Sequence, residues 1–174
     1  KSQTHMKLFA LYFRFLKLCL SLDHRDPRAR TDVERWYAPL VAPLFAGISK
    51  YSIYLNESYI YELIQTLLKL IRVGGDDQPA TAILFSPAER LKCLKSICTI
   101  MSLSDNLLSI DFQVPYTILC EMCHDPATVN SGSDRSSLQA LFDCIDVMIV
   151  KRAKLISPKQ VATIIQRYFQ RLFV

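Results

Sequence analysis

Glycine is scarce in this sequence, with four residues among 174. The loops of nucleotide-binding folds need glycine where the backbone approaches a phosphate, so most of these folds are disfavoured. The sequence also lacks a Walker loop, a Gly-x-Ser-x-Gly motif and a His-Glu-x-x-His motif. Its three histidines lie near expected helix ends or turns, and no carboxylate pair departs from ordinary helix-surface spacing. We therefore expect a non-enzymatic protein without a cofactor.

Long apolar runs are missing as well, although apolar residues are abundant. No run of about 18 uncharged apolar residues occurs, so we expect no membrane-spanning helix. Hydrophobic residues nevertheless make up 51% of the chain, and the mean hydropathy of +0.17 is high for a soluble domain. This surplus of apolar surface has to meet further helices or the proteins of a large complex. The length fits a single domain over residues 1–174, as part of a longer chain or assembly.

The apolar residues recur with a period of 3.6 and not of 2, which is typical of helices. Turn-forming residues gather near three places, where we expect loops: residues 23–30, 74–84 and 124–133. The pattern predicts seven helices, which lie approximately over residues 4–22, 31–47, 56–71, 86–101, 114–123, 134–154 and 157–174. Two of them have the same start signal, a serine N-cap followed by proline and then by glutamate or glutamine: Ser86-Pro87-Ala88-Glu89 and Ser157-Pro158-Lys159-Gln160.

Several local details accompany these helices. We expect Thr4 to cap the first helix, and Pro39 and Pro43 to kink or divide the second. Gly47 should end that second helix, because glycine is favoured just past a helix C-terminus. The segment 52–55 is the only short candidate for a strand.

Similar windows of 19 residues recur along the chain and align without gaps. They begin at Leu55, Phe85 and Ile156, and a fourth begins at Gln3. Amphipathic helices align in this way whenever they share the period of 3.6, so the recurrence alone leaves that interpretation open. Helix pairs of about 35 residues stack into solenoids, because one pair cannot bury its own apolar face. We therefore predict an all-α fold of helical hairpin repeats stacked as a short α-solenoid.

The last window has a more particular likeness. A long helix leads into Leu155-Ile156-Ser157-Pro158-Lys159-Gln160 and then into an apolar run that ends in Leu172-Phe173. This resembles the helical repeats of organellar RNA-binding proteins, namely the octotricopeptide, FAST-kinase-like and RAP-domain families. Residues 85–103 resemble a more diverged copy, and Gln166-Arg167-Tyr168-Phe169 stands where those families often have tryptophan and small residues. The resemblance implies RNA binding in the mitochondrial matrix.

The C-terminal part of the chain is basic. From Val147 to the end it has no acidic residue and six cations, which are Lys151, Arg152, Lys154, Lys159, Arg167 and Arg171. Such a block suits phosphate, since each phosphate that is neutralised releases counterions. The alternative is an ordinary solvated face, which most charge runs are. We predict that these six side chains contact RNA.

A second motif is Cys120-Glu121-Met122-Cys123-His124, which spells the string used for covalent haem attachment. Cys120 and Cys123 would form thioethers and His124 would bind iron, with Met148 as the far axial ligand. Alternatively, Cys120, Cys123 and His124 could bind zinc, with Cys93, Cys98 or Cys144 as the fourth ligand. A third interpretation makes Cys120 a core residue and places Cys123 and His124 at a helix end. Because the expected helices do not resemble a haem domain, we predict no metal.

Three hypotheses follow from these observations. The first is a non-enzymatic helical-repeat component of a mitochondrial RNA–protein assembly, such as the mitochondrial ribosome, with RNA and the proteins of a large complex as partners. The second is a protein–protein adaptor of the α-solenoid type, whose basic face meets an acidic partner. The third is a c-type haem protein. Five of the six cysteines lie within apolar helical patterns, as buried thiols do, which favours a reducing compartment.

Overall fold

A computed structural model of the protein describes residues 2–21, 38–71, 85–103, 113–124, 135–151 and 157–172. These residues form helices and contain no strand, which confirms the predicted all-α class. The α-helices are α1 (Ser2–Ser21), α3 (Ala38–Tyr51), α4 (Glu57–Ile71), α5 (Pro87–Leu103), α6 (Gln113–His124), α8 (Arg135–Asp146) and α9 (Pro158–Leu172). The predicted loops at 23–30 and 74–84 lie outside the described residues, as does 125–133, whereas His124 is the last residue of α6.

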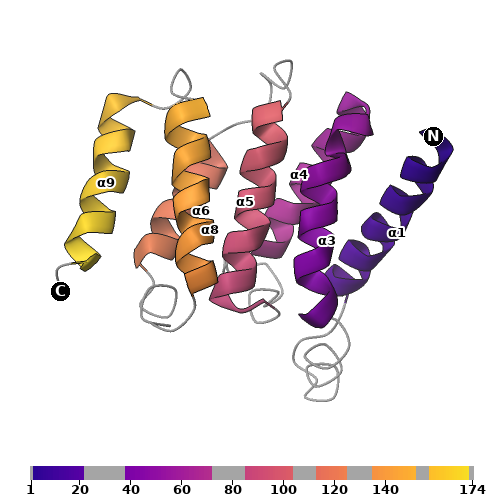
Figure 1. Ribbon diagram of the computed structural model, residues 1–174, viewed down its shortest axis with the longest axis horizontal. Helices are drawn as coiled ribbons and strands as arrows, with labels where there is room; N and C mark the ends of the chain where they lie inside the picture. The colour runs from indigo at the N-terminus through magenta and orange to yellow at the C-terminus, as the bar shows by residue number, and fades with distance from the viewer. Residues whose placement is uncertain are drawn as a thin grey trace.

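The helices are arranged in a row with two layers (Figure 1). Helices α3, α5 and α8 lie side by side in the front layer, and α4 and α6 lie behind them. Helix α1 forms one end of the row and α9 the other, so the two chain termini lie far apart. Helix α5 is central, because it packs against α3, α4, α6 and α8. The stacking of hairpin repeats as a solenoid stays a prediction.

The core is centred on α4 and α5. An amphipathic helix in a two-layered row buries one face, but a central helix with neighbours on several sides buries more of its circumference. The buried apolar residues of α5 are Leu91, Cys93, Leu94, Ile97, Cys98, Ile100 and Met101. Those of α4 are Ile60, Leu63, Ile64, Leu67, Leu68, Leu70 and Ile71. Burial of these side chains supplies the main driving force for folding.

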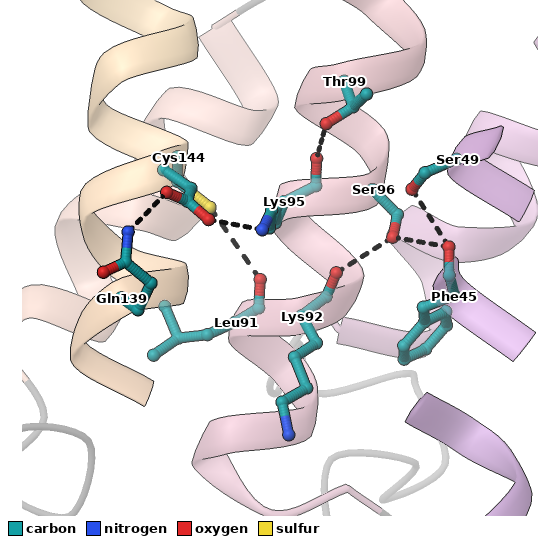
Figure 2. A network of polar contacts seen from close by, with 10 residues as sticks. Phe45, Ser49, Leu91, Lys92, Lys95, Ser96, Thr99, Gln139 and Cys144 are labelled. Carbon is teal, nitrogen blue, oxygen red and sulfur yellow. Dashed lines mark hydrogen bonds and ion pairs between the residues drawn. The ribbon is translucent and has the colours of Figure 1, made fainter. Parts of the chain in front are cut away.

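Polar contacts also join the helices of the front layer (Figure 2). The buried Ser96 hydroxyl lies 3.2 Å from the Phe45 carbonyl of α3 and 3.0 Å from the Lys92 carbonyl of its own helix. It can donate its single proton to either, so this buried polar group is satisfied. On the other side of α5, Lys95 forms an ion pair with Asp143 of α8, and Gln139 donates to the same carboxylate. These contacts fix α3 and α8 against α5.

The two predicted serine-cap helix starts are confirmed. At α5, the Ser86 N–H donates to the Glu89 carboxylate (2.8 Å) and the Glu89 N–H donates to the Ser86 hydroxyl (3.3 Å). At α9, Ser157 and Gln160 make the same reciprocal pair at 2.9 and 3.3 Å. These are capping boxes, in which the two residues satisfy backbone donors that the first helical turn leaves free. The cap residue and the residue three positions later therefore locate both starts.

Two local predictions were wrong in the first half of the chain, and the candidate strand was not confirmed. Helix α1 begins at Ser2, so Thr4 lies in its first turn and not at the cap. Helix α3 passes through Gly47 and ends at Tyr51. The segment Ser52–Tyr54 is the 3-10 helix η2 and not a strand. This 3-10 helix is part of the connection between α3 and α4. A strand needs a second strand to pair with, and the described residues contain none.

The structure explains why Gly47 is a glycine although it lies inside a helix. A Cβ atom at this position would lie 3.0 Å from Cζ of Tyr12 on α1 and still closer to the Tyr12 hydroxyl. Glycine therefore allows α1 to approach α3, which outweighs its lower helix propensity. Pro43 also lies inside α3. A proline there removes the hydrogen bond to the carbonyl of Pro39, which is exposed at the helix start and can be hydrated.

The helix predicted over 134–154 is observed as α8 followed by the π-helix η4 (Val147–Lys151). A π-turn accommodates one extra residue in a helix, and such turns recur at functional sites. Val147 and Met148 are both buried in η4. In the described part of the chain, no helix combines the length and the apolar character that crossing a lipid bilayer requires.

Candidate nucleic-acid interface

Helix α9 carries the end of the row at which the sequence predicted RNA contact. It packs against α6 through the buried Ile164 and the partly buried Val161. Two hydrogen bonds fix its first turn, because the Tyr116 hydroxyl donates to the Gln160 carbonyl (3.4 Å) and the Gln160 amide donates to Gln113 (2.8 Å). Among the described side chains of α9, Ala162, Ile165 and Gln166 are exposed.

Lys159 is the predicted cation whose side chain the structure describes. It is the second residue of α9 and is exposed. Its ammonium group adds to the positive end of the helix dipole, so the first turn of α9 is electropositive. Lys151 ends η4, and Arg167 and Arg171 lie in α9, but their side chains are outside the described residues. Arg152 and Lys154 also lie outside them. The basic face as a whole stays a prediction.

The Cys-x-x-Cys-His string lies in α6. Cys120 and Cys123 are 6% and 3% exposed and belong to the core, and His124 ends the helix with its side chain outside the described residues. A haem bound through both thiols would have to enter that core, so the positions of the two cysteines do not fit this group. Among the described residues, no three histidine, cysteine or acidic side chains converge as metal ligands do.

The cysteines considered as a fourth zinc ligand, Cys93, Cys98 and Cys144, are also buried. Cys93 and Cys144 donate to the backbone carbonyls of Leu67 and Leu91, with S···O distances of 3.8 Å. Burial away from water raises the pKa of both thiols well above the usual value. It likewise raises the pKa of Cys19, to about 11. Thiols that resist ionisation are poor nucleophiles, and these residues pack in the core as small apolar groups do.

An aromatic cluster at the opposite end of the row was missed by the sequence reasoning. We call it the aromatic cluster and define it as His5 of α1, Tyr51 of α3, Tyr54 of η2 and the adjoining Lys50. The His5 ring stacks on Tyr54, with centroids 4.3 Å apart and planes at 15°, and lies 5.8 Å from the ring of Tyr51. The Lys50 ammonium lies 5.5 Å from the Tyr51 centroid. The two tyrosines are three positions apart, which could have indicated an aromatic surface. His5 is remote from both in the sequence, so its stacking on Tyr54 could not be predicted.

The charged residues of α1 and α3 have one sign, whereas α4 contributes Glu57 and Glu62. Helices α1 and α3 have four cations, Lys7, Arg14, Lys17 and Lys50, and no acidic residue. Lys17 forms an exposed ion pair with Glu62 of α4 at 3.1 Å. Such a pair is worth less than about 1 kcal/mol, so it does little to hold α1 in place. The cations of α1 and α3 raise the local concentration of an anionic ligand, and Lys50 is the one that the structure places within the aromatic cluster.

Comparison with known proteins shows similarity to proteins named nucleolar complex protein 3. The chain is 25% identical over 160 residues to the Mus musculus homologue, which covers 92% of this chain and 16% of that protein. The Homo sapiens homologue is 24% identical over the same shares. The Drosophila melanogaster protein is 22% identical over 174 residues, or 96% of this chain and 18% of that protein. The chain thus spans about a sixth of the length of the curated relatives it matches. No family model and no solved structure match it.

These relatives overturn the predicted family and location. The resemblance to organellar repeat proteins was wrong, and so were the mitochondrial matrix and the mitochondrial assembly, because the relatives are nucleolar by name. The physical reason is that the likeness rested on a capping box and an apolar period of 3.6. Both are requirements of any capped amphipathic helix and do not distinguish families. The relatives are named for a complex and not for a reaction.

Proposed function

We propose that this chain is a helical scaffold module of a nucleolar protein complex and that it is not an enzyme. The observation that carries this proposal is the similarity over 92% to 96% of the chain to proteins named nucleolar complex protein 3 from mammals and a fly. The nucleolus is the compartment in which ribosomal subunits are assembled. The complex that this module serves is therefore a pre-ribosomal one, with proteins and RNA as partners.

The fold supports a scaffold role. A row of helices presents more surface for its size than a compact bundle does, and it can hold several partners at fixed distances. Large apolar side chains stay exposed along the row, which is typical of a surface that other chains cover. They are Met6, Leu11, Leu18, Leu40, Ile53, Leu103, Phe142 and Ile165. The buried thiols and the absence of a converging metal-ligand set in the described part fit this role as well.

The end of the row at α9 is the proposed contact for the RNA backbone. Lys159 lies exposed beside the positive end of the α9 dipole, and the same stretch of sequence is free of acidic residues. We assign the contact to the predicted cations Lys151, Arg152, Lys154, Lys159, Arg167 and Arg171. Such a contact follows the phosphates and the shape of the RNA and does not read its sequence.

Sedimentation tests the proposed place in a pre-ribosomal complex. The protein is tagged at its natural locus, and a lysate of the source cells is run on a sucrose gradient with and without ribonuclease. We expect the protein to sediment with particles that hold precursor ribosomal RNA. Sedimentation only as a free protein, or with mitochondrial ribosomes, would refute the proposal.

A salt titration tests the RNA contact at α9. Each phosphate contact to a single strand contributes about 0.7 to the slope of log affinity against log salt concentration. Replacing the six predicted cations by glutamine should therefore flatten that slope. The matched control replaces Lys69 and Lys92, which lie on α4 and α5. An unchanged slope in the six-fold variant would exclude this face as the phosphate contact.

A further inference from the structure

We infer that the aromatic cluster binds single-stranded RNA by stacking a base on Tyr54. This site lies at the opposite end of the row from α9 and uses base faces, whereas α9 is proposed to use phosphates. The inference rests on the proposed function in one respect, because that function supplies RNA as the ligand. It adds a second contact and names the form of RNA that the contact accepts.

The Tyr54 ring is stacked on one side and exposed in part. His5 covers one face of Tyr54 at a centroid distance of 4.3 Å, and Tyr54 is still 56% exposed. Because His5 occupies one face, we assign the base to the opposite face of the ring. The stack with His5 also holds the phenol ring in place, so that little side-chain entropy remains to be lost when a base binds. A nucleobase would extend this stack by one further ring. Every base has a flat aromatic face, so the site would not depend on the RNA sequence.

The basic residues around the cluster favour a nucleic acid as its ligand over an acidic or apolar peptide. Lys50 lies beside Tyr51 within the cluster, and α1 and α3 contribute cations without any acidic residue. Glu57 starts α4 three residues after Tyr54, where the positive end of that helix dipole offsets its charge. A stacking ring beside a cation is the arrangement by which proteins bind unpaired strands. A duplex keeps its bases stacked inside and cannot use this site.

Fluorescence anisotropy of a labelled ten-nucleotide RNA of mixed sequence tests the inference with the full chain. The same sequence annealed to its complement serves as the duplex. We expect Tyr54→Ala to weaken binding of the single strand by about five- to a hundredfold, the range that alanine substitution gives for one stacked base. Duplex affinity should stay unchanged. Tyr54→Phe should bind as the unaltered chain does, since it keeps the ring.

The matched control is Tyr61→Ala. Tyr61 is 49% exposed on α4, and no ring contact involves it among the described residues. It should leave single-strand binding unchanged, and the urea midpoints of all three variants should match that of the unaltered chain. Because Tyr54 contributes a stack and no charge, Tyr54→Ala should also leave the salt slope unchanged.

The outcomes separate this inference from the proposed function. Equal affinity of Tyr54→Ala and the unaltered chain for the single strand would overturn the inference, and so would an equal loss for strand and duplex. If Tyr54→Ala instead removes the protein from pre-ribosomal particles without changing RNA affinity, the cluster binds a protein and the inference is wrong. Co-sedimentation of the unaltered protein with those particles decides the proposed function, whichever result Tyr54→Ala gives.

Discussion

Helices α5 and α9 begin with the same capping box but differ in how many neighbouring helices they contact. Each has a serine cap, a proline and a reciprocal pair with the residue three positions later. Helix α5 then packs against four other α-helices, whereas α9 packs against α6 and keeps much of its surface exposed. Local sequence therefore starts a helix, but its neighbours decide what the helix does. We expect the centre of the row to supply stability, and we propose that its two ends bind partners.

The largest difference between centre and end should appear in a matched pair of isoleucine substitutions. Ile97 of α5 is fully buried and Ile165 of α9 is 44% exposed. Ile97→Ala should lower the free energy of unfolding by about 2–5 kcal/mol, because it removes buried surface and leaves a cavity. Ile165→Ala should change it by less than about 0.5 kcal/mol. Urea denaturation followed by circular dichroism measures both, and similar losses would mean that the centre is not where stability is concentrated.

The contact between α1 and α3 gives the next largest effect. Alanine is ordinarily favoured over glycine in a helix by about 1 kcal/mol. We expect Gly47→Ala to be destabilising by about 1–3 kcal/mol instead, because the new methyl group overpacks against Tyr12. Relief of this contact requires the Tyr12 ring to move from its edge-on packing against the buried Phe9, with ring centroids 5.6 Å apart.

A double-mutant cycle sharpens this result. In a Tyr12→Phe background, which lacks the nearest atom, Gly47→Ala should cost less than in the unaltered chain. Ala46→Gly at an exposed position of α3 measures the helix propensity alone and should cost about 1 kcal/mol. Equal costs of Gly47→Ala in both backgrounds would show that α1 does not approach α3 at this point.

The two caps allow a direct comparison of centre and end. Loss of a serine N-cap costs about 0.5–2 kcal/mol wherever the helix start is formed. Ser86→Ala should therefore lower global stability by about 1 kcal/mol, because α5 takes part in the whole core. Ser157→Ala should act mainly on α9, whose amide protons would exchange faster while global stability changes little. Native-state hydrogen exchange separates the two cases, and equal global losses would contradict the proposed difference.

The smallest effect concerns the ion pair between α5 and α8. The hydrogen bond from Lys95 lowers the pKa of Asp143 below its ordinary value of 3.8. Because the folded pKa is lower than the unfolded one, the pair stabilises the protein above the ordinary carboxyl range, and this stabilisation is lost as the pH falls through the folded pKa. Asp143→Asn should cost about 0.2–1 kcal/mol near neutral pH, since both side chains are partly exposed. Urea titrations at several pH values should show that this cost vanishes in acid.

Much of the fold could be predicted because its signals are local. Residues within one helical turn determine the caps of α5 and α9 and the ends of α4. At the start of α4, for example, the Asn56 side chain accepts a hydrogen bond from the Tyr59 N–H at 3.0 Å. Gly47 was misjudged because its role depends on Tyr12, which lies 35 positions earlier in another helix. A glycine at a helix end and a glycine at a helix crossing look the same in sequence.

The candidate sites were harder to predict for the same reason. The basic run was visible because its cations are close in sequence, but the aromatic cluster joins His5 to Tyr51 and Tyr54 through the packing of α1 on α3. The Cys120 and Cys123 thiols face the core, which a motif cannot reveal. The family was misjudged because a capped amphipathic helix satisfies the same physical requirements in many unrelated proteins.

The central claim is that this chain serves a nucleolar complex, and the location of the protein in its source cells tests that claim most directly. Fluorescence microscopy of the protein tagged at its natural locus, beside a nucleolar marker and a mitochondrial dye, gives the answer. We predict that the tagged protein is concentrated in the nucleolus. A signal that follows the mitochondrial dye, or one spread evenly through the cell without nucleolar enrichment, would contradict the account.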